Sequence, residues 1–316
     1  MSSSEHQSHQ PSNQEIEIDL KELITTIWQG RWKIAIITII TIFLGAFYAF
    51  SQINVYRADA LLAPVAEEST SALSSIGGSL GGLAGLAGID LGSAGIDKKI
   101  LGIETLKSRA FLQNFIQKYD LLIPLLGSKG WDEESKTWII NPEEYNIQEK
   151  KWINYEKEPS LLIAYSVFEK YIDVIEDAKT GIVELTVDSY SPKYAKEWAE
   201  NLVHEVNNYL RKQDVIEAKR SIEFLEEQLS KNQVSEMQTV LYQLVEQQTK
   251  TMMLAEVRNG YVFRVIDPPV IPEEKVKPRR GQILVLSAVL GLALGMFFVF
   301  FSNKLKKDFS AIEVKK

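Results

Sequence analysis

The residue types that most often carry chemistry are few or dispersed in this sequence. It contains three histidines and no cysteine. His6 and His9 lie in a polar N-terminal tail, and His204 is the only histidine of a long predicted helix. Metal sites need several ligands at defined spacings, and the lack of cysteine excludes thiolate sites and disulfides. Carboxylates are plentiful, but they alternate with lysine and arginine as on solvated helix faces. We therefore predict no metal site.

Motifs for nucleophilic or phosphate chemistry are also missing. Eight glycines lie between Gly77 and Gly95, but no Lys-Ser or Lys-Thr follows at the spacing of a phosphate-binding loop. We interpret this stretch as a mobile loop; the alternative is a loop whose leucines touch lipid or a neighbouring subunit. The formal net charge of −7 argues against a nucleic-acid partner. We expect no catalytic residue and no cofactor, and so a protein that is not an enzyme.

Two uncharged apolar stretches lie near the ends of the chain, at Ile34–Ile53 and Ile283–Phe301. Each has about the twenty residues that an α-helix needs to cross a hydrocarbon core of about 30 Å. The polar residues before Ile34 do not resemble a cleaved signal peptide, so we read the first stretch as a retained anchor. Two crossings place both ends of the chain on one side of a membrane.

The charges beside the first stretch predict its orientation. Arg31 and Lys33 precede it, whereas only Arg57 follows closely, which favours a cytoplasmic N-terminus. Basic residues flank the second stretch on both sides, so they do not predict its orientation. In a bacterium the chain would then cross the inner membrane twice, with both termini cytoplasmic and the middle periplasmic.

We predict an α+β fold that is anchored in the membrane by two terminal helices. An α/β base would carry a long protruding helix or helical hairpin. The predicted segments are a tail at 1–33, a span at 34–53, a periplasmic domain at 54–282, a span at 283–301 and a tail at 302–316. Within the domain we assign 54–190 and 259–270 to the base, 192–258 to the helical region and 267–280 to a proline-rich connector.

The pattern of the base predicts short elements. We expect strands at 55–65, 171–175, 182–187 and 261–266, helices at 97–119 and 161–169, and a hairpin around 131–140.

One helical stretch is unusually long. Ser191 and Pro192 form a helix start, and residues 193–257 contain neither proline nor glycine. The stretch forms either one rod on the order of 100 Å long or a hairpin that turns near 230–235, and we favour the hairpin slightly. We expect the apolar stripe of this stretch to pack against another copy of the chain. Its predicted oligomerisation residues are Trp198, Leu202, Leu210, Leu225, Leu229, Leu241 and Leu244.

Two further patterns concern the membrane spans. Four prolines predict a stiff, extended connector that leads into the second span and faces a partner: Pro268, Pro269, Pro272 and Pro278. Small residues recur every fourth position in both spans, which allows close helix packing; the alternative is that they are ordinary residues of membrane helices. The small residues are Thr41, Gly45, Ala49, Ser287, Gly291 and Gly295.

Four segments in order resemble the Wzz-type chain-length determinants, the polysaccharide co-polymerases of bacterial inner membranes. They are Glu17–Leu23, Leu106–Leu112, Val187–Ala195 with Trp198, and Asp267–Pro278. With two terminal spans and a long helix, the resemblance extends over nearly the whole chain. About fifteen residues follow Phe301, without tyrosine or a nucleotide loop, which matches the class that lacks a kinase domain.

The resemblance implies a ring-like homo-oligomer that acts on an integral-membrane polymerase and a lipid-linked polysaccharide. Such proteins set the length of O-antigen of lipopolysaccharide, or of a related polysaccharide, without making or breaking bonds. The alternative is a periplasmic adaptor of a polysaccharide or efflux export system. A two-span receptor is a third hypothesis, but neither tail has the length of an output module.

Overall fold

The computed structural model describes residues 20–65, 98–231, 235–257 and 260–313. The glycine-rich stretch 77–95, His6 and His9 lie outside the described residues. The chain divides into two compact units. One unit contains the two terminal helices, and the other, which we call the base, extends from Ile53 to Lys277.

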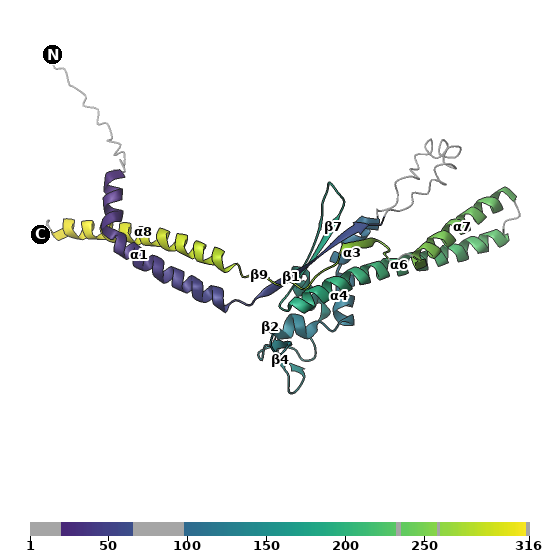
Figure 1. Ribbon diagram of the computed structural model, residues 1–316, viewed down its shortest axis with the longest axis horizontal. Coiled ribbons are helices and arrows are strands. Elements are labelled where there is room, and N and C mark those ends of the chain that lie inside the picture. Colours follow the sequence, from purple (N-terminus) through teal and green to yellow (C-terminus); the bar gives the residue numbers. More distant parts are fainter. Residues whose placement is uncertain (1–19, 66–97, 232–234, 258–259, 314–316) are drawn as a thin grey trace, which may run out of the picture. The chain divides into compact units, whose positions relative to one another are not determined.

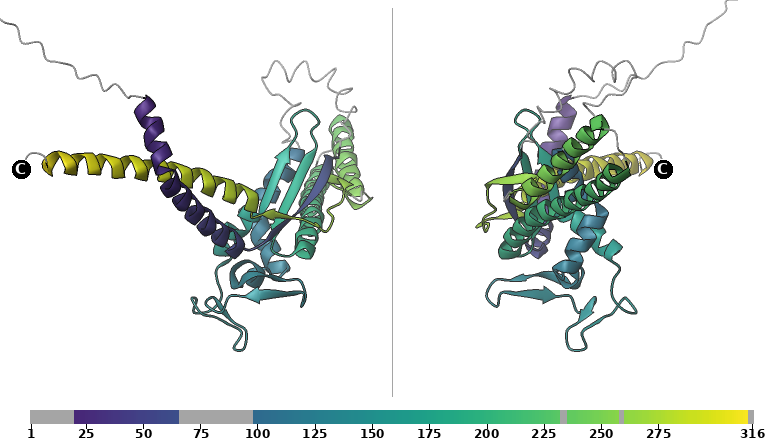
Figure 2. Two further views of the ribbon diagram at one scale, coloured as in Figure 1. Left: turned by 60° about the vertical axis from the view of Figure 1, so that its left-hand side comes forward. Right: turned by 90° about the vertical axis from the view of Figure 1, so that its right-hand side faces the viewer.

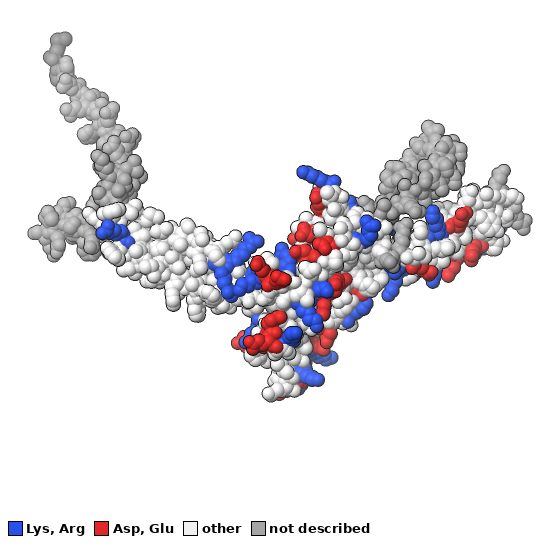
Figure 3. All heavy atoms as spheres, viewed as in Figure 1, with Lys and Arg blue, Asp and Glu red and all other residues white. Residues whose placement is uncertain are grey.

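The first unit is a pair of long helices, α1 (Leu20–Ser51) and α8 (Arg280–Glu313), which lie side by side (Figure 1). Both helices extend beyond the predicted spans. The segments long and apolar enough to cross a membrane are Ile27–Ser51 and Arg280–Ser302. Only 11% and 17% of their most apolar windows are buried, so most of this apolar surface lacks protein cover. The drawn face shows no charged side chain along the middle of the pair (Figure 3).

The base is built on a five-stranded sheet that follows the order β6-β7-β1-β8, with β9 paired to β1. All of its strand pairs are antiparallel. The strands are β1 (Val55–Pro64), β6 (Ile172–Glu176), β7 (Val183–Ser189), β8 (Phe263–Asp267) and β9 (Lys275–Lys277). The four predicted strands are confirmed as β1, β6, β7 and β8. β8 and β9 pair with opposite ends of β1, so β1 organises the sheet.

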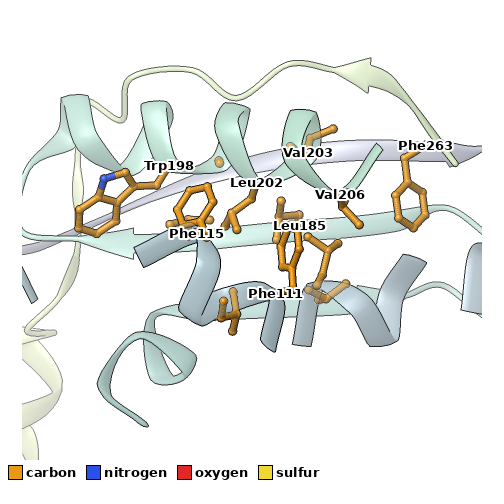
Figure 4. Close-up of a cluster of buried hydrophobic side chains, with 14 of the residues drawn as sticks. Phe111, Phe115, Leu185, Trp198, Leu202, Val203, Val206 and Phe263 are labelled. Atoms are coloured by element: carbon orange, nitrogen blue, oxygen red, sulfur yellow. The ribbon is translucent and has the colours of Figure 1, made fainter. Parts of the chain in front are cut away.

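The core of the base forms where helices pack on this sheet. Side chains from α4 (Arg109–Lys118) and the first part of α6 (Pro192–Lys231) meet strand residues such as Leu185 (Figure 4). α3 (Lys98–Lys107) and α5 (Leu161–Phe168) complete the cover. The predicted helix at 97–119 is wrong as one element. It breaks at Ser108, whose hydroxyl accepts a hydrogen bond from the backbone N–H of Phe111 and caps α4.

Between α4 and α5 lie two small hairpins. The predicted hairpin around 131–140 is confirmed as β2 (Ser128–Asp132) and β3 (Thr137–Ile140). A π-helical turn at Ile123–Gly127 precedes it. The sequence did not predict the second hairpin, β4 (Tyr145–Asn146) and β5 (Lys151–Trp152), because two-residue strands leave no alternating pattern.

The long helical stretch is a hairpin of two helices rather than one rod. α6 is followed by α7 (Ser235–Val257), and the two pack side by side (Figures 1 and 2). The favoured hairpin is therefore confirmed. The domain boundary at 192 needs a correction, however, since the first five turns of α6 belong to the core of the base.

Candidate functional site

An ion cluster lies where the chain enters and leaves the base. The side chain of Asp188 on β7 is 5% exposed, and its carboxylate is bound by two basic residues from neighbouring strands. Arg57 on β1 donates from Nε to Oδ1 at 2.7 Å and from an Nη atom to Oδ2 at 3.0 Å. Lys277 on β9 donates to Oδ2 at 3.0 Å. We call these three residues the Asp188 ion cluster.

The charges in this cluster stabilise each other. Burial alone would raise the pKa of Asp188, but the hydrogen bonds from Arg57 and Lys277 outweigh it and lower that pKa. The hydrogen bond to Asp188 likewise raises the pKa of Arg57. Val55 pairs with Lys277, so the first and last strands of the base are neighbours at this point. The cluster therefore ties together the two strands that continue into α1 and α8.

The four prolines of the predicted connector do not form one stiff segment. Pro268, Pro269 and Pro272 lie in the loop between β8 and β9, where Pro269 is buried. Pro278 comes after β9 and before α8. The prediction of an extended connector is corrected here, because β9 interrupts the run and joins the sheet beside β1.

In the helical pair, the small residues of the two spans face each other. A Cβ placed on Gly45 would lie 2.0 Å from Ser287 Oγ, and one placed on Gly291 would lie 2.0 Å from Thr41 Oγ1. A Cβ on Gly295 would lie 3.0 Å from Ile34 Cα. Ala49 is buried as well. At these positions only glycine lets the two backbones approach so closely.

The predicted oligomerisation residues divide into two groups. Trp198, Leu202 and Leu210 are at most 4% exposed and pack in the core of the base, so they are not available to another copy. Leu241 is buried too, Leu225 and Leu229 are half-buried, and only Leu244 is exposed. The outward apolar residues of the α6–α7 hairpin are others: Ile216, Phe224, Met237, Val240, Tyr242, Met253 and Val257.

A buried asparagine joins α6 to the chain that returns to the sheet. The Asn207 Oδ1 accepts hydrogen bonds from the backbone N–H groups of Tyr261, Val262 and Phe263 at 2.8–3.1 Å. Its Nδ2 donates to the carbonyls of Val203 and Phe263 at 3.1 and 3.0 Å. One side chain thus satisfies five backbone groups. The sequence gives no sign of this role, because four of the five partner groups of Asn207 lie more than fifty residues away.

A second polar cluster fixes α3 to the same region. Lys98 Nζ lies 2.9 Å from Asp214 Oδ2 and donates to the hydroxyl of Tyr261 at 3.2 Å, while that hydroxyl donates to Asp214. Burial lowers the pKa of Lys98, but the contacts with Asp214 and Tyr261 outweigh it, so the net shift is upward. This arrangement holds three segments together. Over the part of the chain that the structure describes, no three His, Asp or Glu side chains are grouped as a metal site requires.

The sequence as a whole was compared with known protein families. Residues 16–119 match the Wzz family, described as chain length determinant protein. This region contains α1, β1, α3 and α4. This match covers 104 of the 316 residues. Two of the segments that suggested this family are now placed in the fold: Ser108 caps α4, and Val187–Ala195 contains Asp188 of the ion cluster.

A second family matches another part of the sequence. Residues 226–303 match the GNVR family, described as a G-rich domain on putative tyrosine kinase. This range contains α7, β8, β9 and most of α8. The description of this family mentions a tyrosine kinase, whereas the sequence predicted the class without a kinase domain.

Solved structures similar to the chain were also found. One is a full-length bacterial polysaccharide co-polymerase, 14% identical, with 92% of this chain and 99% of that chain covered and a TM-score of 0.39. Another is a fragment of WzzB, a polysaccharide co-polymerase from Salmonella Typhimurium, 11% identical, with 71% and 100% covered and a TM-score of 0.31. No curated protein matches the chain. The similarity to the Wzz family rests on the sequence match over residues 16–119.

Proposed function

We propose that this protein regulates the length of a polysaccharide as a scaffold on an integral-membrane polymerase, and that it makes and breaks no bond itself. The observation that carries this proposal is the Wzz match over residues 16–119. The ion cluster, Asn207 and the Lys98 cluster all join segments of the fold, which is a structural role for the polar side chains described above. O-antigen of lipopolysaccharide is the polysaccharide that we propose first.

The two terminal helices cross the bacterial inner membrane in this proposal, with both termini cytoplasmic and the base periplasmic. Their apolar surface supports this, because exposed side chains such as Phe43, Phe47 and Phe297 are each at least 70% exposed. In water such a surface would be strongly unfavourable, whereas lipid covers it without cost. Arg31 and Lys33 at one end of the first apolar segment support the orientation.

We further propose that copies of the chain assemble into a ring through the outer surface of the α6–α7 hairpin. Phe224 and Tyr242 are 59% and 63% exposed on this hairpin, and Val257 is 80% exposed. A second copy would remove this apolar surface from water, at about 25 cal/mol per Å². The scaffold would then control how long the polymerase stays on a growing, lipid-linked chain.

A deletion strain tests the function. The gene is removed, and the surface polysaccharide is separated by size on a gel, with complementation by the intact gene as the control. We expect a narrow length distribution to become broad or short, while polysaccharide still reaches the surface. An unchanged distribution would contradict length control. Loss of surface polysaccharide with normal lengths inside the cell would instead favour the export adaptor.

A further inference from the structure

We propose that the end of the base from which both connectors leave lies in the headgroup zone of the membrane, where a group of tryptophans and tyrosines contacts lipid. The inference rests on the membrane location given under Proposed function. It adds an interaction surface on the base itself, in addition to the two spans. The surface consists only of residues between Ile53 and Lys277.

The connectors restrict how far this end of the base can be from lipid. Ile53 comes two residues after the end of α1, and Lys277 comes three residues before the start of α8. A fully extended chain covers at most about 3.6 Å per residue, so these residues lie within roughly 7–11 Å of the ends of the helices. Val55 and Lys277 pair in the sheet, so both limits apply to the same edge of the base.

Half-buried aromatic side chains gather at this edge. Tyr56 on β1 pairs with Ser189, the last residue of β7, and Tyr190 follows directly. The hydroxyl of Tyr171 donates to that of Tyr190 at 2.9 Å. The first turns of α6 then bring Tyr194 within 5.4 Å of Trp131 and 5.1 Å of Trp138, measured between ring centroids. The membrane-edge aromatics are therefore Tyr56, Trp131, Trp138, Tyr171, Tyr190 and Tyr194.

The β2–β3 hairpin adds an exposed apolar patch at the same edge. A methyl group placed on Gly130 would lie 3.5 Å from Ile53 Cγ2 and 3.6 Å from Ile139 Cδ1. Ile53 and Ile139 are 41% and 42% exposed. The hairpin is thus packed beside the residue that follows the first connector. Asp132, Glu133 and Glu134 lie at its turn, so we expect the strands rather than the turn to contact lipid.

The composition of this edge matches a headgroup zone. Tryptophan and tyrosine concentrate at membrane interfaces, because their rings are apolar while their N–H or O–H groups remain near water. Exposed lysines stand beside the aromatics: Lys193 on α6, which pairs with Glu197, and on β9 Lys277, which pairs with Asp188, and Lys275. Of these, Lys275 is the one that we expect to meet lipid phosphates. Because the connectors are short, this edge of the base must lie close to the lipid around the two spans.

Because the natural chain has no cysteine, single labels can be placed without background. Three variants of the full-length protein carry one spin label each: Ile139→Cys, Ile175→Cys and Ile39→Cys. Ile175 is 52% exposed and pairs with Glu184 near the opposite end of the sheet, so it is the matched control. Ile39 on α1 is 65% exposed and tests the span. Each protein is reconstituted in phosphatidylethanolamine and phosphatidylglycerol bilayers.

Accessibility to oxygen, which is soluble in lipid, is compared with accessibility to a nickel chelate, which is soluble in water. We expect the oxygen-to-nickel ratio at residue 139 to lie severalfold above that at 175 and below that at 39. Equal ratios at 139 and 175, with a high ratio at 39, would overturn the inference and leave the membrane location intact. Low accessibility of residue 139 to both reagents would indicate a protein partner and also overturn it. A low ratio at 39 would contradict the membrane location itself.

Discussion

At the scale of single residues, Asn207 is the side chain whose loss should harm the fold most for its size. It satisfies five backbone groups in the core between α6 and β8. Replacing it by alanine removes the acceptor of three buried N–H groups and the donor to two carbonyls. We expect Asn207→Ala to lower the free energy of unfolding by about 2–5 kcal/mol. Thermal unfolding of the detergent-solubilised protein, followed by circular dichroism, measures the change.

Asn208→Ala is the matched control, because the amide of Asn208 contacts only the exposed ring of His204 in the described hydrogen bonds. It should unfold like the parent protein, within about 0.5 kcal/mol. Similar losses in both variants would mean that helix α6 is sensitive to any change there, and that the hydrogen bonds of Asn207 are not the cause.

Asp188 gives a prediction about pH. Its pKa is lowered in the folded protein, so its contribution to stability is present above the unfolded pKa of about 3.9 and is lost as pH falls through the folded value. We expect Asp188→Asn to lower stability by about 1–3 kcal/mol at neutral pH, discounted because Lys277 is largely exposed. The difference between parent and variant should shrink below about pH 4.

Unfolding midpoints measured between pH 3 and pH 8 test this. Glu184→Gln on the same strand is the control, since Glu184 is exposed. A difference between parent and Asp188→Asn that stays constant down to pH 3 would show that the charge of Asp188 is not what stabilises the strands.

At the scale of elements, the contact between α1 and α8 depends on glycine. A Cβ on Gly291 would meet Thr41 Oγ1 at 2.0 Å and the backbone Cα of Thr38 at 2.9 Å, so even alanine requires the helices to move apart. A Cβ on Gly281 meets nothing within 4 Å. We therefore expect Gly291→Ala to separate the helices and broaden the polysaccharide lengths, while Gly281→Ala changes neither.

The separation is measured between spin labels at Phe47→Cys and Val285→Cys, two exposed positions of the pair. The label distance should increase in the Gly291→Ala background and stay unchanged in the Gly281→Ala background. If the distance grows while the polysaccharide lengths stay normal, close helix packing is a structural property without a part in length control.

An element could be predicted from the sequence when the residues that cause it lie within the element itself. β1, β6, β7, β8, α5 and the β2–β3 hairpin were predicted because alternation, helical periodicity and turn residues are present within each segment. The break at Ser108 depends on one capping hydroxyl inside an otherwise continuous helical pattern. β9 follows a proline run and has only three residues. The pairing of β8 and β9 with β1 depends on a partner about two hundred residues away.

The residues of the site were predicted less well, for the same reason. The apolar stripe of α6 was assigned to another copy of the chain, yet Trp198, Leu202 and Leu210 pack in its own core. A core and an oligomer interface require the same helical period, so sequence alone does not separate them. Asp188 lay in a segment already linked to the family, but its partners Arg57 and Lys277 became visible only with the sheet.

At the scale of the whole molecule, self-association and folding should depend on different residues. Phe224 and Tyr242 are exposed on the α6–α7 hairpin, whereas Leu202 is fully buried. We expect Phe224→Ser with Tyr242→Ser to reduce the oligomer to smaller species without lowering the unfolding temperature. Leu202→Ala should instead cost about 2–5 kcal/mol of stability. Native mass spectrometry and thermal unfolding provide the two measurements.

An unchanged oligomer in the double variant would contradict this assignment. If the double variant keeps its full oligomer mass, the ring contacts lie elsewhere than on the exposed side of the hairpin. Leu244, the exposed member of the residues first expected to mediate oligomerisation, would then be the next position to replace.

The pairing of Val55 with Lys277 has a consequence for protein engineering. A domain whose first and last residues are neighbours can be inserted into a surface loop of an unrelated host protein. The insertion then requires only that the two ends of the host loop lie about as far apart as two paired strands. The base from Ile53 to Lys277 meets this condition, with its ends joined by hydrogen bonds and by the Asp188 ion cluster. Natural recombination could exploit the same property, exchanging bases between different membrane anchors without redesigning either.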